Sequence, residues 1–279
     1  MRKLEKSMVF AGNLILVNQN HPLCCTIVAE NLCPAFERQP EILMQRESAV
    51  MLDRLLLELN KSISEEINDS IVGVSGYRTR SEQEEIFKTS LEESGREFTE
   101  KYVAFPDHSE HQTGLAIDLA ENREEIDFIR PPFPYQGICQ KFRKKMADFG
   151  FIERYPKEKQ KITKIGAEPW HFRYVGVPHA EIMQRYGMVL EEYIVWLKQF
   201  SFPYHPFVWQ KGDKEFKIGY VKAEGAFTRM DFPKYEKQTQ QLEDKTGDII
   251  LYSLAEGKKL PNIQISGNNV DGFVITYAQ

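Results

Sequence analysis

The sequence of 279 residues lacks long hydrophobic runs, clustered basic charge and internal repeats. No stretch approaches the roughly 18 consecutive apolar residues of a membrane-spanning helix, so we expect no membrane span. The formal net charge is -5 and the isoelectric point is about 5.8. Because nucleic-acid binding relies on a basic patch or stripe, we expect no nucleic-acid partner. The absence of a repeat argues against solenoid folds and favours unique globular sequence.

Cysteine is scarce, and its four positions form no recognisable site. Cys24, Cys25, Cys33 and Cys139 have neither CxxC spacing nor the pattern of a disulfide framework. They fit a reducing compartment. The N-terminus has basic residues and a short apolar run, but Asn13 interrupts that run and no small-residue cleavage site follows. We therefore expect a cytoplasmic protein, or an extracellular or membrane-anchored one if an N-terminal anchor has been removed.

Two regions with different patterns follow one another along the chain. The chain is longer than the roughly 150 residues that serve as a guide for one domain. Residues 1-200 mix helical and strand patterns, which indicates an α+β domain. Beyond Phe200, Pro203 and Pro206 lie in an aromatic-rich linker, and short strand patterns are separated by Gly and Asn turns. We expect a main domain at 1-200 and a small β-rich domain at 205-279.

The periodicity of apolar residues and the capping signals place the elements. A capping box of Ser81 and Glu84 predicts a helix from near Glu82 towards Ser94. Further helices are predicted at 41-59, 135-150, 178-187 and 190-200. Strands are predicted at 71-74, 115-119, 172-175, 216-221, 248-252, 263-265 and 273-277.

A set of polar residues between 105 and 175 has the chemistry of a zinc site. Zinc catalysis needs a few N or O ligands, an open position for water and a nearby carboxylate that takes the proton of that water. His111 and Asp118 lie on a loop and the strand that follows it, so both can point at one ion. His171 would be the third ligand, and Glu168, three residues earlier, the general base. From spacing alone, a structural role for each histidine is the commoner explanation.

Three motifs, in order and at matching spacing, resemble the D-Ala-D-Ala peptidases of vancomycin resistance, the VanY and VanXY types. They are Ser75-Gly76-Tyr77-Arg78-Thr79 with Gln83, then Ser109-x-His111-x-x-Gly114-x-Ala116-x-Asp118, and Glu168-Pro169-Trp170-His171-Phe172-Arg173-Tyr174-Val175-Gly176. The similarity extends over roughly residues 12 to 198. It implies the Hedgehog/D-Ala-D-Ala peptidase-like zinc fold, an α+β fold with helices packed on a mainly antiparallel sheet. Residues 1-200 would then be the catalytic domain, and 205-279 a β-rich domain of unknown role.

The resemblance also implies the residues of the site. A Zn²⁺ ion would lie on His111, Asp118 and His171, with Glu168 as the base. Arg78 would stabilise the tetrahedral oxyanion, a role that suits a fixed guanidinium; a surface salt bridge to the helix that follows is the alternative. Gln83 and Ser109 match substrate-binding positions, and Ser75, Tyr77 and Trp170 complete the expected substrate site.

The residue three positions before the catalytic arginine bears on the substrate. It is often Asp in relatives that hydrolyse the free dipeptide and Ser in carboxypeptidases, and here it is Ser75. We therefore expect a D,D-carboxypeptidase acting on peptidoglycan precursor pentapeptides that end in D-Ala-D-Ala, in vancomycin resistance or cell-wall remodelling. Hydrolysis of the D-Ala-D-Ala dipeptide stays open. The alternatives are an L,D-carboxypeptidase of wall tetrapeptides and a non-catalytic wall-binding module, although Glu168 and Arg78 argue against lost catalysis.

Overall fold

The chain forms two compact units. A computed structural model describes residues 2-61, 70-127, 129-230, 239-243, 249-253 and 263-278. The first unit is Val17–Val189, and the second combines Met1–Leu16 with Leu190–Gln279. Among the described residues, no helix has both the length and the apolar character needed to cross a membrane.

An antiparallel four-stranded sheet lies at the centre of the first unit. Its order is β4 (Ile71–Ser75), β5 (Ala116–Glu121), β7 (Glu168–Tyr174) and β6 (Phe151–Tyr155). A hairpin of β2 (Leu32–Phe36) and β3 (Gln39–Gln45) adds a second, two-stranded sheet. Helices and antiparallel sheet together confirm the predicted α+β class.

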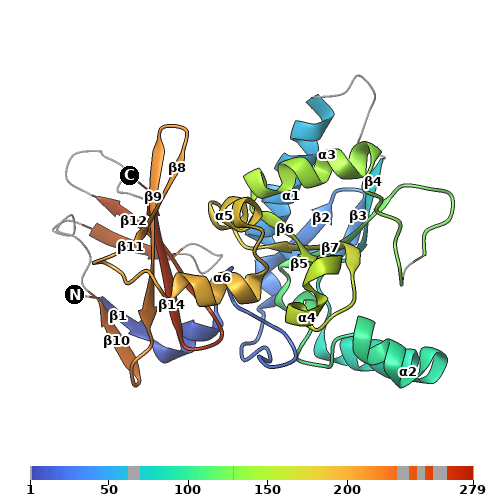
Figure 1. Cartoon of the computed structure of the whole chain (residues 1–279), viewed down its shortest axis with the longest axis horizontal. Coiled ribbons are helices and arrows are strands. Elements are labelled where there is room, and N and C mark those ends of the chain that lie inside the picture. Colours follow the sequence, from blue (N-terminus) through green and yellow to red (C-terminus); the bar gives the residue numbers. More distant parts are fainter. Residues whose placement is uncertain are drawn as a thin grey trace. The chain divides into compact units, whose positions relative to one another are not determined.

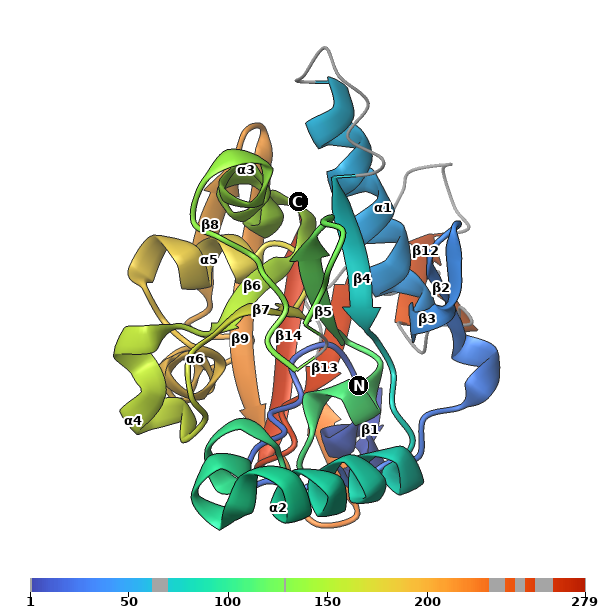
Figure 2. The same cartoon turned by 90° about the vertical axis from the view of Figure 1, so that its right-hand side faces the viewer.

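In the part of this unit that the structure describes, α-helices accompany these sheets (Figures 1 and 2). They are α1 (Arg46–Lys61), α2 (Arg80–Tyr102), α3 (Gly137–Lys145), α4 (Gln160–Thr163) and α5 (His179–Tyr186). Leu52, Leu55 and Leu59 form the buried face of α1, a spacing that places them on one side of a helix. Helix α2 lies across the end of the sheet where β4 ends (Figure 2), so residues just after β4 can meet those of α2.

The structure corrects three sequence predictions. The predicted helix at 41-59 begins only at Arg46, because the apolar run before it pairs with β2 as strand β3. Helix α2 is capped by Thr79 and Glu82 instead of Ser81 and Glu84, since both pairs have the capping-box spacing and Thr79 precedes the first turn. The same helix continues to Tyr102 across a kink at Gly95, where φ is 76°.

Glu168, Pro169 and Trp170 also differ from the sequence prediction, which placed them in a tight turn before the strand. They belong to β7 itself. The other predicted strands and helices of this unit are present within a few residues.

The second unit is β-rich. Its main sheet has the order β13 (Ile263–Gly267), β14 (Gly272–Ala278), β9 (Lys214–Lys222) and β8 (Phe207–Lys211). Two-stranded pairs are formed by β1 (Arg2–Glu5) with β10 (Phe227–Met230) and by β11 (Thr239–Glu243) with β12 (Ile249–Ser253). Helix α6 (Leu190–Leu197) also belongs to this unit. The predicted strands are thereby confirmed, except that Asp248 of the 248-252 prediction lies outside the described residues.

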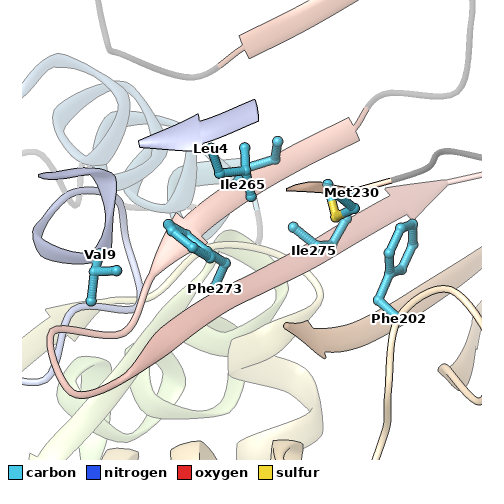
Figure 3. Packing of buried hydrophobic residues seen from close by; sticks show 7 residues of the cluster. All are labelled: Leu4, Val9, Phe202, Met230, Ile265, Phe273 and Ile275. Carbon is cyan, nitrogen blue, oxygen red and sulfur yellow. The ribbon is translucent and has the colours of Figure 1, made fainter. Parts of the chain in front are cut away.

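The N-terminal segment is part of the β-rich core. Leu4 and Val9 are buried in one cluster with Phe273 and Ile275 of β14 (Figure 3). Burying each such side chain stabilises the fold by about 1.5-3 kcal/mol. The first residues of the chain therefore stabilise the same core as the C-terminal strands. The sequence prediction of a domain at 1-200 included this segment and α6, whereas in the structure both belong to the β-rich unit. Whether the two units have separate roles stays a prediction.

His179, at the start of α5, makes stability depend on pH. The side chain is buried, and burial lowers its pKa from 6.5 to about 3. Between these values the unfolded chain binds a proton that the folded chain does not, so stability falls as the pH drops below 6.5. From pH 6.5 to 5 we expect this histidine to cost about 2 kcal/mol. Urea unfolding of the unchanged protein and of His179→Gln at both pH values tests this, because the variant should lose less stability on acidification. Equal losses would contradict it.

Candidate metal centre

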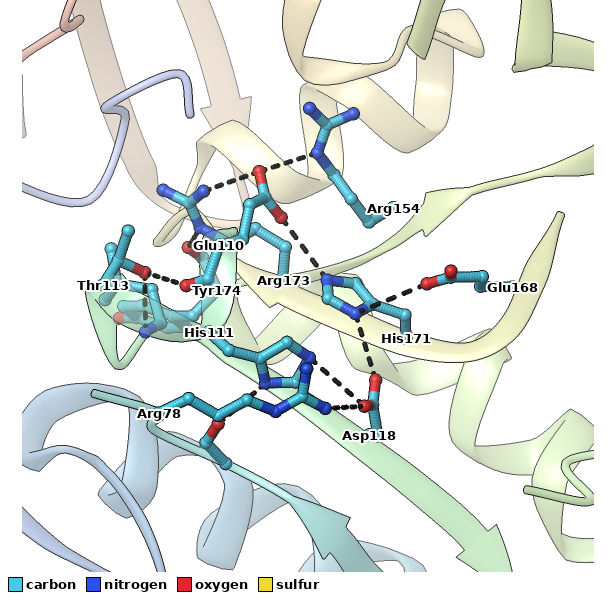
Figure 4. Close-up of polar contacts among 12 residues, drawn as sticks. Arg78, Glu110, His111, Thr113, Asp118, Arg154, Glu168, His171, Arg173 and Tyr174 are labelled. Carbon is cyan, nitrogen blue, oxygen red and sulfur yellow. Dashed lines mark hydrogen bonds and ion pairs between the residues drawn. The ribbon is translucent and has the colours of Figure 1, made fainter. Parts of the chain in front are cut away.

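Three buried side chains converge from separate elements. His111 lies on the short 3-10 helix η4 (Glu110–Thr113), Asp118 on β5 and His171 on β7. Asp118 and His171 are directly paired across the two strands, so their side chains leave the same face of the sheet. Asp118 Oδ2 is 3.2 Å from His111 Nε2, and Asp118 Oδ1 is 3.0 Å from His171 Nδ1. One ligand atom from each residue lies within 4.8 Å of the others (Figure 4).

The backbone after β4 holds His111 in place. Its Nδ1 is 2.7 Å from the carbonyl oxygen of Gly76, so Nδ1 donates and Nε2 is left facing Asp118. Gly76 packs closely against β3: a Cβ there would lie 2.3 Å from the carbonyl oxygen of Leu43. Glycine is therefore needed for the Gly76 carbonyl to reach the imidazole.

Burial and mutual contact set the charges of this triad. Burial would raise the pKa of Asp118, but the two histidines outweigh it and hold that pKa well below its usual range. Burial and the nearby Arg78 lower the pKa of His111. Burial also lowers the pKa of His171, but the hydrogen bond to Asp118 and the nearby carboxylates of Glu110 and Glu168 prevail and raise that pKa to about 9.

Glu168 reaches the triad because β7 bulges. Glu153 of β6 pairs with Phe172 of β7, and Tyr155 of β6 pairs with Glu168 of β7. Between these two cross-strand pairs β6 advances by two residues but β7 by four, so β7 has two extra residues there. The extra residues turn Glu168 and His171 towards each other although they are three apart, a spacing that a regular strand would place on opposite faces. Glu168 Oε2 is 3.7 Å from His171 Nδ1. Burial raises the pKa of Glu168 to about 8, and a cation in the triad would favour its ionised form.

Arg78 points into the same site. Its Nη2 is 3.2 Å from Asp118 Oδ2, and its Nε donates to Ser75 Oγ at 2.8 Å. Gln83 Oε1 accepts from Arg78 Nη1 at 3.5 Å, while the Gln83 amide donates to Ala104 O at 2.8 Å. The alternative for Arg78, a surface salt bridge to the helix that follows, is made instead by Arg80, which pairs with Glu84 of α2 at 2.7 Å. Ser75 and Gln83 thus brace Arg78.

A cavity of about 590 Å³ opens onto the triad. All ten residues singled out from the sequence line it: Ser75, Tyr77, Arg78, Gln83, Ser109, His111, Asp118, Glu168, Trp170 and His171. His108, three residues before His111, is a further histidine near this region, and it lies half-buried with Nδ1 2.7 Å from Asn18 O.

Glu110, Arg154 and Arg173 form a buried group beside the triad that the sequence motifs did not predict. Glu110 Oε1 lies 2.8 Å from both Arg154 Nε and Arg173 Nη1, and the side chains of all three are fully buried. Burial would raise the pKa of Glu110, but the two guanidinium groups outweigh it and hold that pKa well below its ordinary value. Glu110 and Arg173 lie inside the motifs that carry the family resemblance, beside His111 and Phe172. Their position in these motifs is the signal from which a role at the site could have been predicted.

The chemistry of the donor set fits a bound metal ion. Two imidazole nitrogens and one carboxylate are the ligand types of catalytic zinc sites, which leave a further position open. A second carboxylate of raised pKa and a guanidinium face the same cavity. Together, the fold and this site are those of a metal-dependent hydrolase.

Comparison with known proteins gives the family. The VanY family model, described as D-alanyl-D-alanine carboxypeptidase, matches residues 43–177. VanXYC of Enterococcus gallinarum, a bifunctional D-Ala-D-Ala dipeptidase and D-Ala-D-Ala carboxypeptidase, is 40% identical over 189 residues, which are 67% of this chain and 96% of that protein. The chain belongs to the VanY family of D-alanyl-D-alanine carboxypeptidases.

Solved structures agree with this assignment. The vancomycin resistance D,D-dipeptidase VanXYg, in complex with a D-Ala-D-Ala phosphinate analogue, matches with a TM-score of 0.85 and 43% identity, covering 100% of this chain and 98% of that chain. VanYB in complex with D-alanine-D-alanine matches with a TM-score of 0.51 and 29% identity, covering 66% of this chain and 97% of that chain.

Proposed function

We propose that the protein is a zinc-dependent D,D-carboxypeptidase that removes the terminal D-Ala from peptidoglycan precursors ending in D-Ala-D-Ala. The observation that carries the proposal is the convergence of His111, Asp118 and His171 with Glu168 and Arg78 in one cavity. Family membership and relatives described with D-Ala-D-Ala substrates or analogues support it. By this proposal the enzyme contributes to vancomycin resistance or wall remodelling. The four free cysteines suit action on cytoplasmic precursors.

Each residue of the site has a part in this reaction. His111, Asp118 and His171 would hold the Zn²⁺ ion, which when bound supplies Lewis acidity and makes a water molecule nucleophilic near neutral pH. Glu168 takes the proton of the attacking water and then donates a proton to the leaving amine of D-alanine. Arg78, braced by Ser75 and Gln83, stabilises the negative charge that develops on the scissile carbonyl oxygen. Ser109, Tyr77 and Trp170 line the cavity and would position the substrate.

Ser75 supports a preference for the longer substrate. The free dipeptide carries an ammonium at the position where a pentapeptide has a neutral amide. A carboxylate would pair with that ammonium, whereas the hydroxyl of Ser75 is engaged by Arg78. We therefore expect pentapeptide trimming to exceed dipeptide hydrolysis.

The release of D-alanine from a precursor pentapeptide tests the function. We expect zinc-loaded protein to release D-alanine, a chelator to stop the release and added zinc to restore it. The same assay is run on the free dipeptide and on a tetrapeptide that ends in a single D-Ala. Hydrolysis of the dipeptide as fast as the pentapeptide would contradict the substrate preference. Release from the tetrapeptide alone would show an L,D-carboxypeptidase, and no release from any substrate would support a non-catalytic wall-binding module.

A further inference from the structure

Glu110 is a buried carboxylate held by two guanidinium groups next to the metal centre. Its side chain and those of Arg154 and Arg173 have no solvent exposure, and both arginines contact Oε1 at 2.8 Å. A buried charge needs such partners, because removing an ion from water without compensation is costly. The three residues come from η4, β6 and β7, so the group is fixed by the central sheet.

The second oxygen of Glu110 points at His171 (Figure 4). Oε2 lies 3.5 Å from His171 Nε2, somewhat longer than an ordinary hydrogen bond. Among the residues that the structure describes, both atoms are buried and neither has a hydrogen-bond partner. Buried polar atoms are rarely left unsatisfied, so a carboxylate oxygen and a ring nitrogen facing each other form a natural donor and acceptor pair.

We propose that Glu110 is a positioning residue that accepts the Nε2–H of His171 and so presents the Nδ1 lone pair of that ring to the metal. This inference rests on the proposed function only in taking His171 as a ligand. His171 Nδ1 already lies 3.0 Å from Asp118 Oδ1, on the side where the other donor atoms gather.

The two histidines of the site are therefore oriented by different acceptors. His111 uses the backbone carbonyl of Gly76 at 2.7 Å, a neutral group. His171 faces a carboxylate, and a carboxylate behind a metal-bound histidine fixes the ring and raises its basicity as a ligand. Arg154 and Arg173 keep the Glu110 side chain ionised and aimed, which makes it an acceptor and not a donor.

The substitution Glu110→Gln tests this role, because the amide keeps the shape of the side chain but removes its charge. We expect the zinc dissociation constant, measured by competition with a chromophoric chelator in the absence of substrate, to rise by about 10- to 100-fold. The visible absorption spectrum of the cobalt-loaded variant should also differ from that of the unchanged protein. Glu153→Gln is the matched control, since Glu153 is a nearly buried carboxylate 2.7 Å from Arg143 and outside the metal triad. It should bind zinc as the unchanged protein does.

Without the Glu110 carboxylate, two buried guanidinium groups lose their negatively charged partner, and the single variant could misfold for that reason. A second variant therefore keeps the test valid. Glu110→Gln combined with Arg154→Met removes one excess charge and should fold while still binding zinc weakly. Arg154→Met alone keeps the carboxylate and should bind zinc more tightly than the double variant. Zinc affinity in folded Glu110→Gln, or in the double variant, equal to that of the unchanged protein would overturn the proposal. Because the readout is zinc binding, weakened binding would support the proposal even if no D-alanine were released from any peptide.

Discussion

Replacing Glu168 by glutamine is expected to lower the rate of D-alanine release by about a thousandfold, within the range of 10²–10⁴ for general acid-base catalysis. The amide has nearly the shape of the carboxylate but can neither accept the proton of the attacking water nor return it to the leaving amine. Glu168 is buried, its Oε2 is 3.7 Å from His171 Nδ1, and burial raises its pKa to about 8. Such a group suits proton transfer near neutral pH.

The measurement is the steady-state kcat and KM for a pentapeptide ending in D-Ala-D-Ala, together with zinc content. We expect kcat to fall while the variant still binds zinc, because Glu168 is not among the proposed ligands. Glu121→Gln is the control, since Glu121 ends β5, the strand that carries Asp118, but pairs with Arg123 outside the cavity. A Glu168→Gln variant that keeps zinc and more than a tenth of the rate would contradict the assignment of the base.

Replacing Arg78 by methionine is expected to lower kcat by about 10²–10³-fold, the usual cost of removing a group that stabilises an oxyanion. The guanidinium is fixed by Ser75 Oγ at 2.8 Å and by Asp118 Oδ2 at 3.2 Å, so in the proposed mechanism it would act on the scissile carbonyl without reorganising. Arg78→Lys should recover only part of the rate, because an ammonium keeps the charge but loses the planar fork.

Arg80→Met is the matched control for Arg78. Arg80 lies two residues further on, its side chain is 60% exposed, and it pairs with Glu84 and Asp107 on the surface. Its removal should leave kcat unchanged. An Arg78→Met variant that raises KM alone, with kcat intact, would show that the arginine binds the ground state and does not stabilise the transition state.

Local patterns predicted much of the fold. Strands β4 and β5, and helices α1 and α5, follow from apolar periodicity and turn residues, which act over short stretches of chain. The helix boundaries that were predicted wrongly lie where the sequence fits two local structures equally well. The sequence offers two overlapping capping boxes near the start of α2, and the structure forms the one of Thr79 and Glu82. The apolar residues of β3 fit a helix as well as a strand until their pairing with β2 is known.

The candidate site shows a similar division between local chemistry and tertiary structure. The candidate ligands and catalytic residues could be chosen from the sequence because they stand in motifs that resemble those of a known family, and the structure brings them to one cavity. The bulge in β7 that turns Glu168 towards His171 could not be predicted, because it depends on the register with β6. Glu110 and its two arginines were missed for the same reason. Their contacts join residues 44 and 63 positions apart in the sequence.

Anomalous X-ray scattering at the zinc absorption edge, from crystals of the zinc-loaded protein, tests the central claim most directly. The account predicts one strong peak at about 2.0-2.2 Å from a nitrogen of His111, an oxygen of Asp118 and a nitrogen of His171, which are the distances of zinc to such ligands. No peak at this position in the zinc-loaded protein, or a peak bound by other residues, would contradict it.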